Sequence, residues 1–186
     1  MAIAQATMMN DGKTLRDVLP AEVVKEIEGE LQRIAPGLPL APPLDRMHIW
    51  AMAMTLAMLE PQLKNPGVQP LDMMLYQRAE ALKKKTGGIE TVEEQIGIFT
   101  QFSTEEQITM LRETLAELKK GREGGKSGMA EMSEAYATGD LQRLTDTMNA
   151  WMKTGDQAIA AKFEKALLTD RNVLMGERKA EKLKAQ

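Results

Sequence analysis

Apolar residues recur along this chain with the spacing of helices rather than the alternation of strands. Between residues 21 and 34, directly after Pro20, the apolar side chains fall on one helical face: Val23, Val24, Ile27, Leu31 and Ile34. Proline suits a helix start, so the pattern predicts a helix over 21–34. No segment alternates for more than a few residues. We therefore expect a mainly α protein, a multi-helix irregular bundle with at most one or two short strands near residues 85–90.

Further helices are predicted over residues 44–59, 71–84, 91–99, 103–120, 129–136, 141–151 and 159–184. The most apolar of them, 44–59, should be the buried centre of the fold, with Pro61 just beyond its end. Thr91 can cap the helix that follows it, and Ser103 with Glu106 forms the pattern of a capping box. The proline-rich residues 36–43 should be an extended connector.

Glycine is concentrated in residues 121–128, between two helical parts of the chain. Such a composition is typical of a flexible linker. We therefore predict a helical lobe over 1–120, a linker over 121–128 and a C-terminal helical lobe over 129–186. Asp140 and Asp156 each follow a Thr-Gly turn in the second lobe and can cap the next helix.

The composition is that of an ordinary folded domain and excludes several classes of function. The net charge is −3 and basic residues lie beside acidic ones, which argues against nucleic-acid binding. The chain has no cysteine, so it has no thiolate chemistry. Its longest apolar run, 49–59, is shorter than the ~20 residues that span a bilayer, and its first ten residues do not form a convincing signal peptide. The composition therefore assigns no compartment.

The carboxylates at 90–94 are the leading candidates for chemistry. Glu90 follows Gly87 and Gly88, which let a backbone approach an ion or substrate closely, so it is a candidate catalytic residue and metal ligand. Glu94 is a weaker metal candidate. The alternative is that Glu93 and Glu94 are N-terminal acids that stabilise a helix dipole.

His48, the methionines and the tryptophans admit structural interpretations. His48 is the chain's one histidine and lies in a predicted apolar helix, where a structural role is favoured over metal binding. Trp50 and Trp151 are expected to anchor helices. Five methionines could line an adaptable groove or bind copper(I), although their spacing favours core packing: Met52, Met54, Met58, Met73 and Met74.

The order of several short motifs resembles the TraB/GumN (TraB/PrgY, Tiki-like) family. These motifs are DGKTL at 11–15, DVLP at 17–20, LDRM at 44–47, GGIETVEEQ at 87–95, ATGDL at 137–141 and LLTDRN at 167–172. The resemblance implies the middle of a longer α/β protein, where a helical insert lies between two halves of a catalytic sheet. It also implies that Glu90 sits at the end of a core strand facing the active cleft.

The resemblance further implies metal-dependent peptide hydrolysis with manganese or cobalt. The family's Gly-x-x-His and Gly-Ala-x-His motifs are absent from this sequence, and one carboxylate cannot hold and activate a metal-bound water. We therefore expect a fragment or degenerate member of a metallopeptidase-like family that is inactive alone. The alternative is a stand-alone helical module that binds a partner helix or an apolar ligand. Exposed helix faces also lead us to expect self-association.

Overall fold

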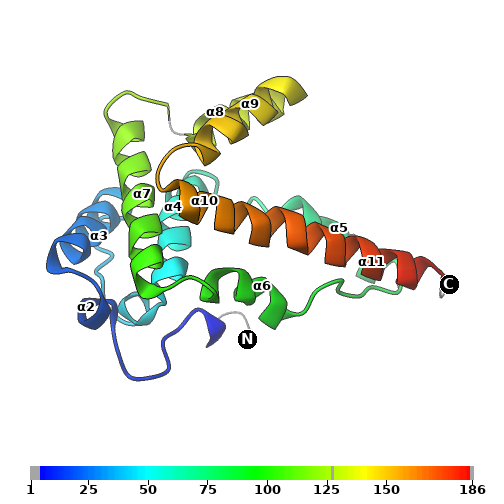
Figure 1. Cartoon of the computed structure of the whole chain (residues 1–186), viewed down its shortest axis with the longest axis horizontal. Coiled ribbons are helices and arrows are strands. Elements are labelled where there is room, and N and C mark those ends of the chain that lie inside the picture. Colours follow the sequence, from blue (N-terminus) through cyan, green and yellow to red (C-terminus); the bar gives the residue numbers. More distant parts are fainter. Residues whose placement is uncertain (1–4, 127, 185–186) are drawn as a thin grey trace.

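The computed structural model describes residues 5–126 and 128–184, and all regular structure in these ranges is helical (Figure 1). An isolated antiparallel bridge between Met8 and Met47 is the nearest approach to sheet structure there. The mainly α prediction is confirmed. Residues 85–89 form no strand.

The helices follow one another with short connections. In chain order they are α2 (Leu15–Val18), α3 (Ala21–Ile34), the 3₁₀ turn η1 (Leu44–Arg46), α4 (Ile49–Lys64), α5 (Leu71–Ala81), α6 (Val92–Thr100), α7 (Thr104–Arg122), α8 (Gly128–Thr138), α9 (Leu141–Met152), α10 (Gln157–Glu164), the π-helix η2 (Lys165–Asp170) and α11 (Arg171–Lys184). The predicted capping box at Ser103 and the caps at Thr91 and Asp156 are all formed.

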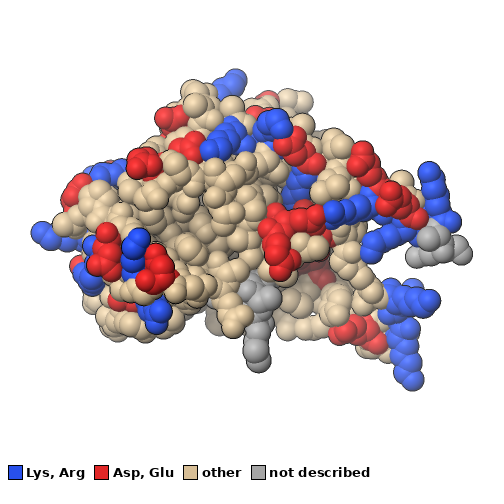
Figure 2. All heavy atoms as spheres, turned by 60° about the horizontal axis from the view of Figure 1, so that its bottom comes forward, with Lys and Arg blue, Asp and Glu red and all other residues tan. Residues whose placement is uncertain are grey.

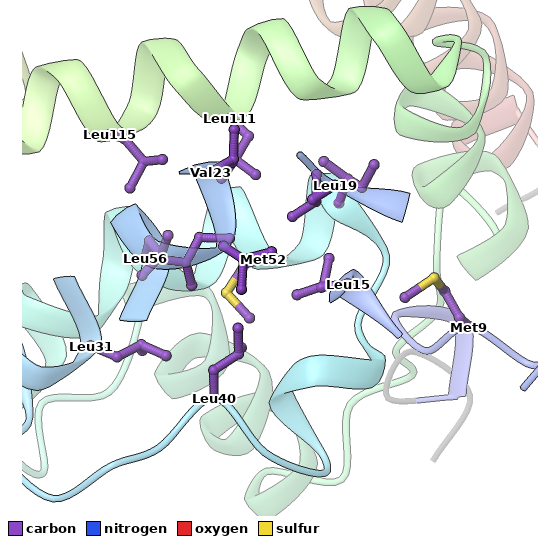
Figure 3. Close-up of a cluster of buried hydrophobic side chains, with 13 residues drawn as sticks. Met9, Leu15, Leu19, Val23, Leu31, Leu40, Met52, Leu56, Leu111 and Leu115 are labelled. Carbon is purple, nitrogen blue, oxygen red and sulfur yellow. The ribbon is translucent and has the colours of Figure 1, made fainter. Parts of the chain in front are cut away.

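The core lies where α4 packs between α3 and α7 (Figure 3). Leu111 and Leu115 of α7 point toward Met52 and Leu56 of α4. Side chains of α2 and α3 close the cluster, among them Leu15, Val23, Ile27 and Leu31, which are fully buried. The prediction that residues 44–59 lie at the centre is therefore right for one face of α4.

Helices α4 and α7 run in the same direction. Near their starts, the backbone N–H of Trp50 donates to the side-chain oxygen of Gln107 over 3.3 Å. Near their ends, Arg33 of α3 pairs with Glu60 of α4, while Arg122 of α7 pairs with Glu30 of α3. This arrangement leaves a long surface along the two helices for other parts of the chain.

Two predicted helix ends are wrong. Pro61 lies inside α4, which continues to Lys64, because the fold tolerates the loss of one backbone donor there. Helix α5 ends at Ala81 rather than Lys84. The backbone of Lys83 takes a positive φ of 54°, and the N–H of Lys84 donates to the carbonyl of Ala79, which closes the helix end.

The C-terminal helix was predicted as one element over 159–184. It is close to continuous in space, and α10, η2 and α11 form a rod (Figure 1). The wider turn of η2 lies in its middle and changes the face that each half presents. Half-buried Phe163 of α10 packs near Phe99 and Phe102, whereas α11 lies against residues 88–94.

The predicted division into two lobes stays a prediction. Helix α7 continues to Arg122 and α8 begins at Gly128, so the connector is shorter than predicted. Ion pairs join the two parts of the chain, for example Lys162 to Glu106 over 2.8 Å. The side chain of Trp151, predicted to be an anchor, lies outside what the structure describes.

None of the described helices has the length and apolar character needed to cross a bilayer. On the face shown in Figure 2, acidic and basic side chains are interspersed, and basic side chains gather toward the C-terminal end.

Candidate functional site

The turn at residues 87–91 leads directly into α6 and fixes the position of Glu90. Thr91 is the N-cap residue: its side-chain oxygen accepts from the N–H of Glu94 over 3.2 Å. In return, the Glu94 carboxylate accepts from the N–H of Thr91 over 2.8 Å. This capping box satisfies two backbone donors and holds Glu94 back against the turn. Glu90 and Glu94 consequently both face α11.

Arg171 binds both oxygens of the Glu90 carboxylate. Its Nε donates to one oxygen and its Nη2 to the other, each over 2.7 Å. The Glu90 side chain is only 7% exposed. A bidentate pair of this kind is the strongest form of carboxylate recognition by arginine, and it satisfies a charge that would otherwise be buried at high cost.

Arg178 lies seven residues after Arg171, about two turns further along α11, and binds Glu94 in the same manner. Its two terminal nitrogens donate to the Glu94 oxygens over 2.7 and 2.5 Å, and one also donates to the Ile89 carbonyl over 3.0 Å. Lys182 then donates to the Gly88 carbonyl over 2.9 Å. Together these contacts form the arginine clamp, defined as Glu90, Glu94, Arg171, Arg178 and Lys182.

The basic half of the clamp was not predicted from the sequence. Arg171, Arg178 and Lys182 are spaced by seven and four residues, so they share one face of α11. That spacing is visible in the sequence. It names no partner, however, because Glu90 lies 81 residues before Arg171.

The clamp keeps both carboxylates ionised. The hydrogen bonds from Arg171 lower the pKa of Glu90, although burial works against them. The pKa of Glu94 is lowered to about 2, chiefly by Arg178 and then by the Thr91 N–H. Each carboxylate in turn raises the pKa of its arginine. A general acid at neutral pH needs a raised pKa, so neither carboxylate is suited to that role in this arrangement.

The donor set does not fit a metal ion as it stands. All four carboxylate oxygens of Glu90 and Glu94 accept from arginines. Among the described residues, no three His, Asp or Glu side chains converge as a metal centre would require. A cation could be ligated here only after a guanidinium had moved away.

His48 is the N-cap residue of α4 rather than part of an apolar helix. Its ring stacks on Trp50, with centroids 6.4 Å apart, and Trp50 stacks on Phe99 at 4.7 Å. The indole N–H of buried Trp50 has no hydrogen-bond partner within the described ranges. This aromatic stack supports the structural interpretation of His48 and the anchoring role of Trp50.

A large groove lies beside this stack, between α4 and α7 on one side and α8 and α10 on the other. It encloses about 1230 Å³. We call it the methionine groove; its apolar lining includes Trp50, Met54, Met58, Met110, Met129, Met132, Phe99 and Phe163. The predicted core packing is correct for Met52, but Met54 and Met58 are 47% and 41% exposed and line the groove. Met73 and Met74 are exposed on α5.

The bond between Glu90 and Arg171 is expected to contribute to stability. Arg171→Gln should lower the free energy of unfolding by about 1.5–3 kcal/mol, because it leaves a buried carboxylate without its charged partner. Glu90→Gln should cost a similar amount, and the double variant should cost clearly less than the sum. Chemical denaturation of all four proteins measures this coupling.

Arg143 and Glu134 provide the matched control, since they form an ion pair of 3.0 Å with both side chains nearly half exposed. The same cycle there should give a coupling below about 1 kcal/mol. Equal coupling in the two cycles would contradict a special role for the Glu90 pair.

Lowering the pH should break the ion pair between Glu94 and Arg178. The pKa of Glu94 is about 2 in the folded protein, against an ordinary value of 4.5. Its contribution to stability is therefore complete above about pH 5 and is lost as the pH falls toward 2. The stability difference between wild type and Glu94→Gln should shrink over that interval in urea unfolding at a series of pH values. Glu93→Gln, at an exposed neighbour outside the clamp, should show no such trend.

Comparisons with known proteins agree with the resemblance seen in the motifs. The TraB/PrgY/gumN family matches residues 1–186. The curated relatives include the metalloprotease TIKI1 of Danio rerio, 27% identical over 95% of this chain and 43% of the relative, and TIKI2 of Xenopus tropicalis, 25% identical over 95% and 41%. Human TIKI1 is 23% identical over 95% of this chain and 42% of its own length.

The chain thus spans less than half the length of these relatives. No solved structure matches it. Because the family match extends over every residue of the sequence, the chain belongs to the TraB/PrgY/gumN family.

Proposed function

We propose that this chain is the helical region of a TraB/GumN-type, metal-dependent peptide hydrolase. The observation that carries the proposal is the similarity to metalloproteases named TIKI over 95% of the chain. The helical fold supports it, because the family resemblance implies a helical insert between two halves of a catalytic sheet. The substrate class is a peptide, and the expected metal is manganese or cobalt.

The chemistry of the proposed hydrolase requires donors beyond those described. Glu90 stays the proposed catalytic carboxylate and metal ligand, with Glu94 as a weaker ligand. Both are engaged by arginines, so the proposal places the remaining metal-binding groups in sequence outside these 186 residues. Within the 186 residues, the clamp's role is to fix α11 against the turn before α6. The chain alone is accordingly proposed to be inactive.

The methionine groove favours a second candidate function. A helical module that binds a partner helix or an apolar ligand needs a concave apolar surface, and the groove between α4, α7, α8 and α10 is one. This function needs no metal and no flanking sequence. It is compatible with the first, because a hydrolase must also hold its peptide.

Self-association is the proposed consequence of the surface of α5. This helix has no buried residue, and its large apolar side chains are about half exposed or more: Leu71, Met73, Met74, Leu75 and Tyr76. Apolar surface of this extent on one element is typical of an interface. We propose that a second copy of the chain covers it when no other partner does.

The first test compares the 186-residue chain with a polypeptide extended through its flanking coding sequence. With manganese or cobalt added, the chain alone should not cleave a panel of apolar peptides, whereas the extended protein should cleave them and lose activity with a chelator. Calorimetric titration of either metal into the chain and its Glu90→Gln variant should show no binding by either. Metal-dependent turnover by the chain alone would overturn the proposed inactivity.

The α5 surface is tested by sedimentation velocity at a series of concentrations. Wild type should associate as the concentration rises, and Leu75→Glu should shift the equilibrium toward monomer, because a carboxylate on this surface cannot be buried cheaply. Val173→Glu, at an exposed position on α11, is the control and should associate like wild type. A monomer at all concentrations would count against the interface.

A further inference from the structure

We propose that the methionine groove binds a partner polypeptide as an apolar α-helix of about four turns, with a carboxylate at the end that meets Lys64 and Arg122. Four features of the groove support this occupant: its lining, its dimensions, its helical walls and its charge. It lies apart from the arginine clamp, and none of its lining residues belongs to the clamp.

Several apolar side chains of the lining are about half exposed in the part of the chain that the structure describes. Met54 and Met58 project from α4, and Met129, 48% exposed, projects from α8 on the other wall. Methionine is flexible and polarisable, so surfaces rich in it adapt to apolar partners of varied shape. Such side chains gain free energy when an apolar partner removes them from water.

The dimensions favour a polypeptide over a small molecule. Small-molecule sites usually enclose about 300–1,000 Å³. The groove encloses about 1230 Å³, which exceeds that range. It follows α4 from Trp50 to Lys64, a distance of about 20 Å at 1.5 Å per residue, which matches an α-helix of about 14 residues.

The walls favour a helix over an extended peptide. The groove's walls are built mainly from α4, α7, α8 and α10, whose backbone N–H and C=O groups are largely used within their own helices. An extended peptide would find no strand edge to pair with there. A helix satisfies its own backbone groups and offers apolar side chains to the methionines. The occupant is therefore helical.

The charge at one end of the groove favours an acidic group on the occupant. Arg33, Lys64 and Arg122 meet there and share two carboxylates, Glu30 and Glu60, so these five side chains together carry a net charge of +1. Further along α7, Glu113 also lines the groove and has no ion-pair partner among the described side chains. The charge therefore differs between the two ends of this otherwise apolar groove, and a carboxylate on the occupant complements the Lys64 end.

The inference rests on the second candidate function proposed above, the binding of a partner helix, and not on the proposed hydrolase. Binding is measured without metal and without turnover. If peptide binding fails while the extended protein still cleaves peptides, this inference falls and the proposed hydrolase stands. If the peptide binds and the extended protein cleaves nothing, this inference stands and the proposed hydrolase falls.

The experiment uses fluorescence anisotropy with labelled 14-residue peptides. The test peptide is a helix former with leucines at positions one, four, eight and eleven and glutamates at one end, and a second peptide carries lysines in place of the glutamates. Wild type should bind the acidic peptide more tightly. Met54→Lys with Met58→Lys should weaken binding at least tenfold, because two charges would then lie against the apolar face.

Leu141→Lys with Val173→Lys is the matched control, since both side chains are exposed and lie outside the groove, on α9 and α11. It should bind like wild type. Lys64→Glu, a change at an exposed side chain, should weaken the acidic peptide and strengthen the lysine peptide, and this reversal does not depend on the methionine variants folding.

Three results would overturn the proposal. One is the absence of binding by wild type, and another is an equal loss in the control with Leu141→Lys and Val173→Lys. The third is equal binding of a peptide whose helix is interrupted by two prolines, because the groove would then accept apolar material of any shape. Circular dichroism of each variant checks that the fold is retained.

Discussion

The structure depends on the way α4 is buried. This helix carries apolar residues around its whole circumference, a pattern that normally belongs to a helix enclosed on all sides. Here Met52 and Leu56 face α3 and α7 and are fully buried, while Met54 and Met58 face away from that core. The same helix therefore forms the centre of the fold and one wall of the groove. The core orders the backbone, and the unburied side leaves an apolar surface whose exposure costs free energy.

The arginine clamp places a second constraint on the chain, and it is electrostatic. A buried carboxylate is tolerated only with a well-placed charge partner, and Arg171 provides one for Glu90. The same bonds that stabilise the folded chain occupy the oxygens that a metal would need. If Glu90 is the metal ligand that we propose, a metal must therefore compete with Arg171 for its carboxylate. The competition would be decided in favour of a metal only where additional donors, and a new site for the guanidinium, offset the lost pair.

Local features were predictable and distant pairings were not. Thr91 and Ser103 cap their helices through contacts within three residues, so sequence alone located them. The ends of α4 and α5 depended on how the fold accommodates Pro61 and Lys83, which propensity does not specify. The candidate carboxylates were found, but their arginines come from a helix some eighty residues later. Methionine spacing on α4 could not show which of its faces α7 would cover.

The groove and α5 both expose apolar surface, but they differ in shape. Apolar surface that the helices of a folded chain do not cover is available to a partner. On α5 the surface is convex and lies on a single helix, a shape that a flat or a second convex surface can cover with few constraints. In the groove four helices surround a concavity and charge differs along its length, so an occupant must match in shape, backbone state and charge. The proposed groove site therefore places more constraints on its partner than the proposed α5 interface does.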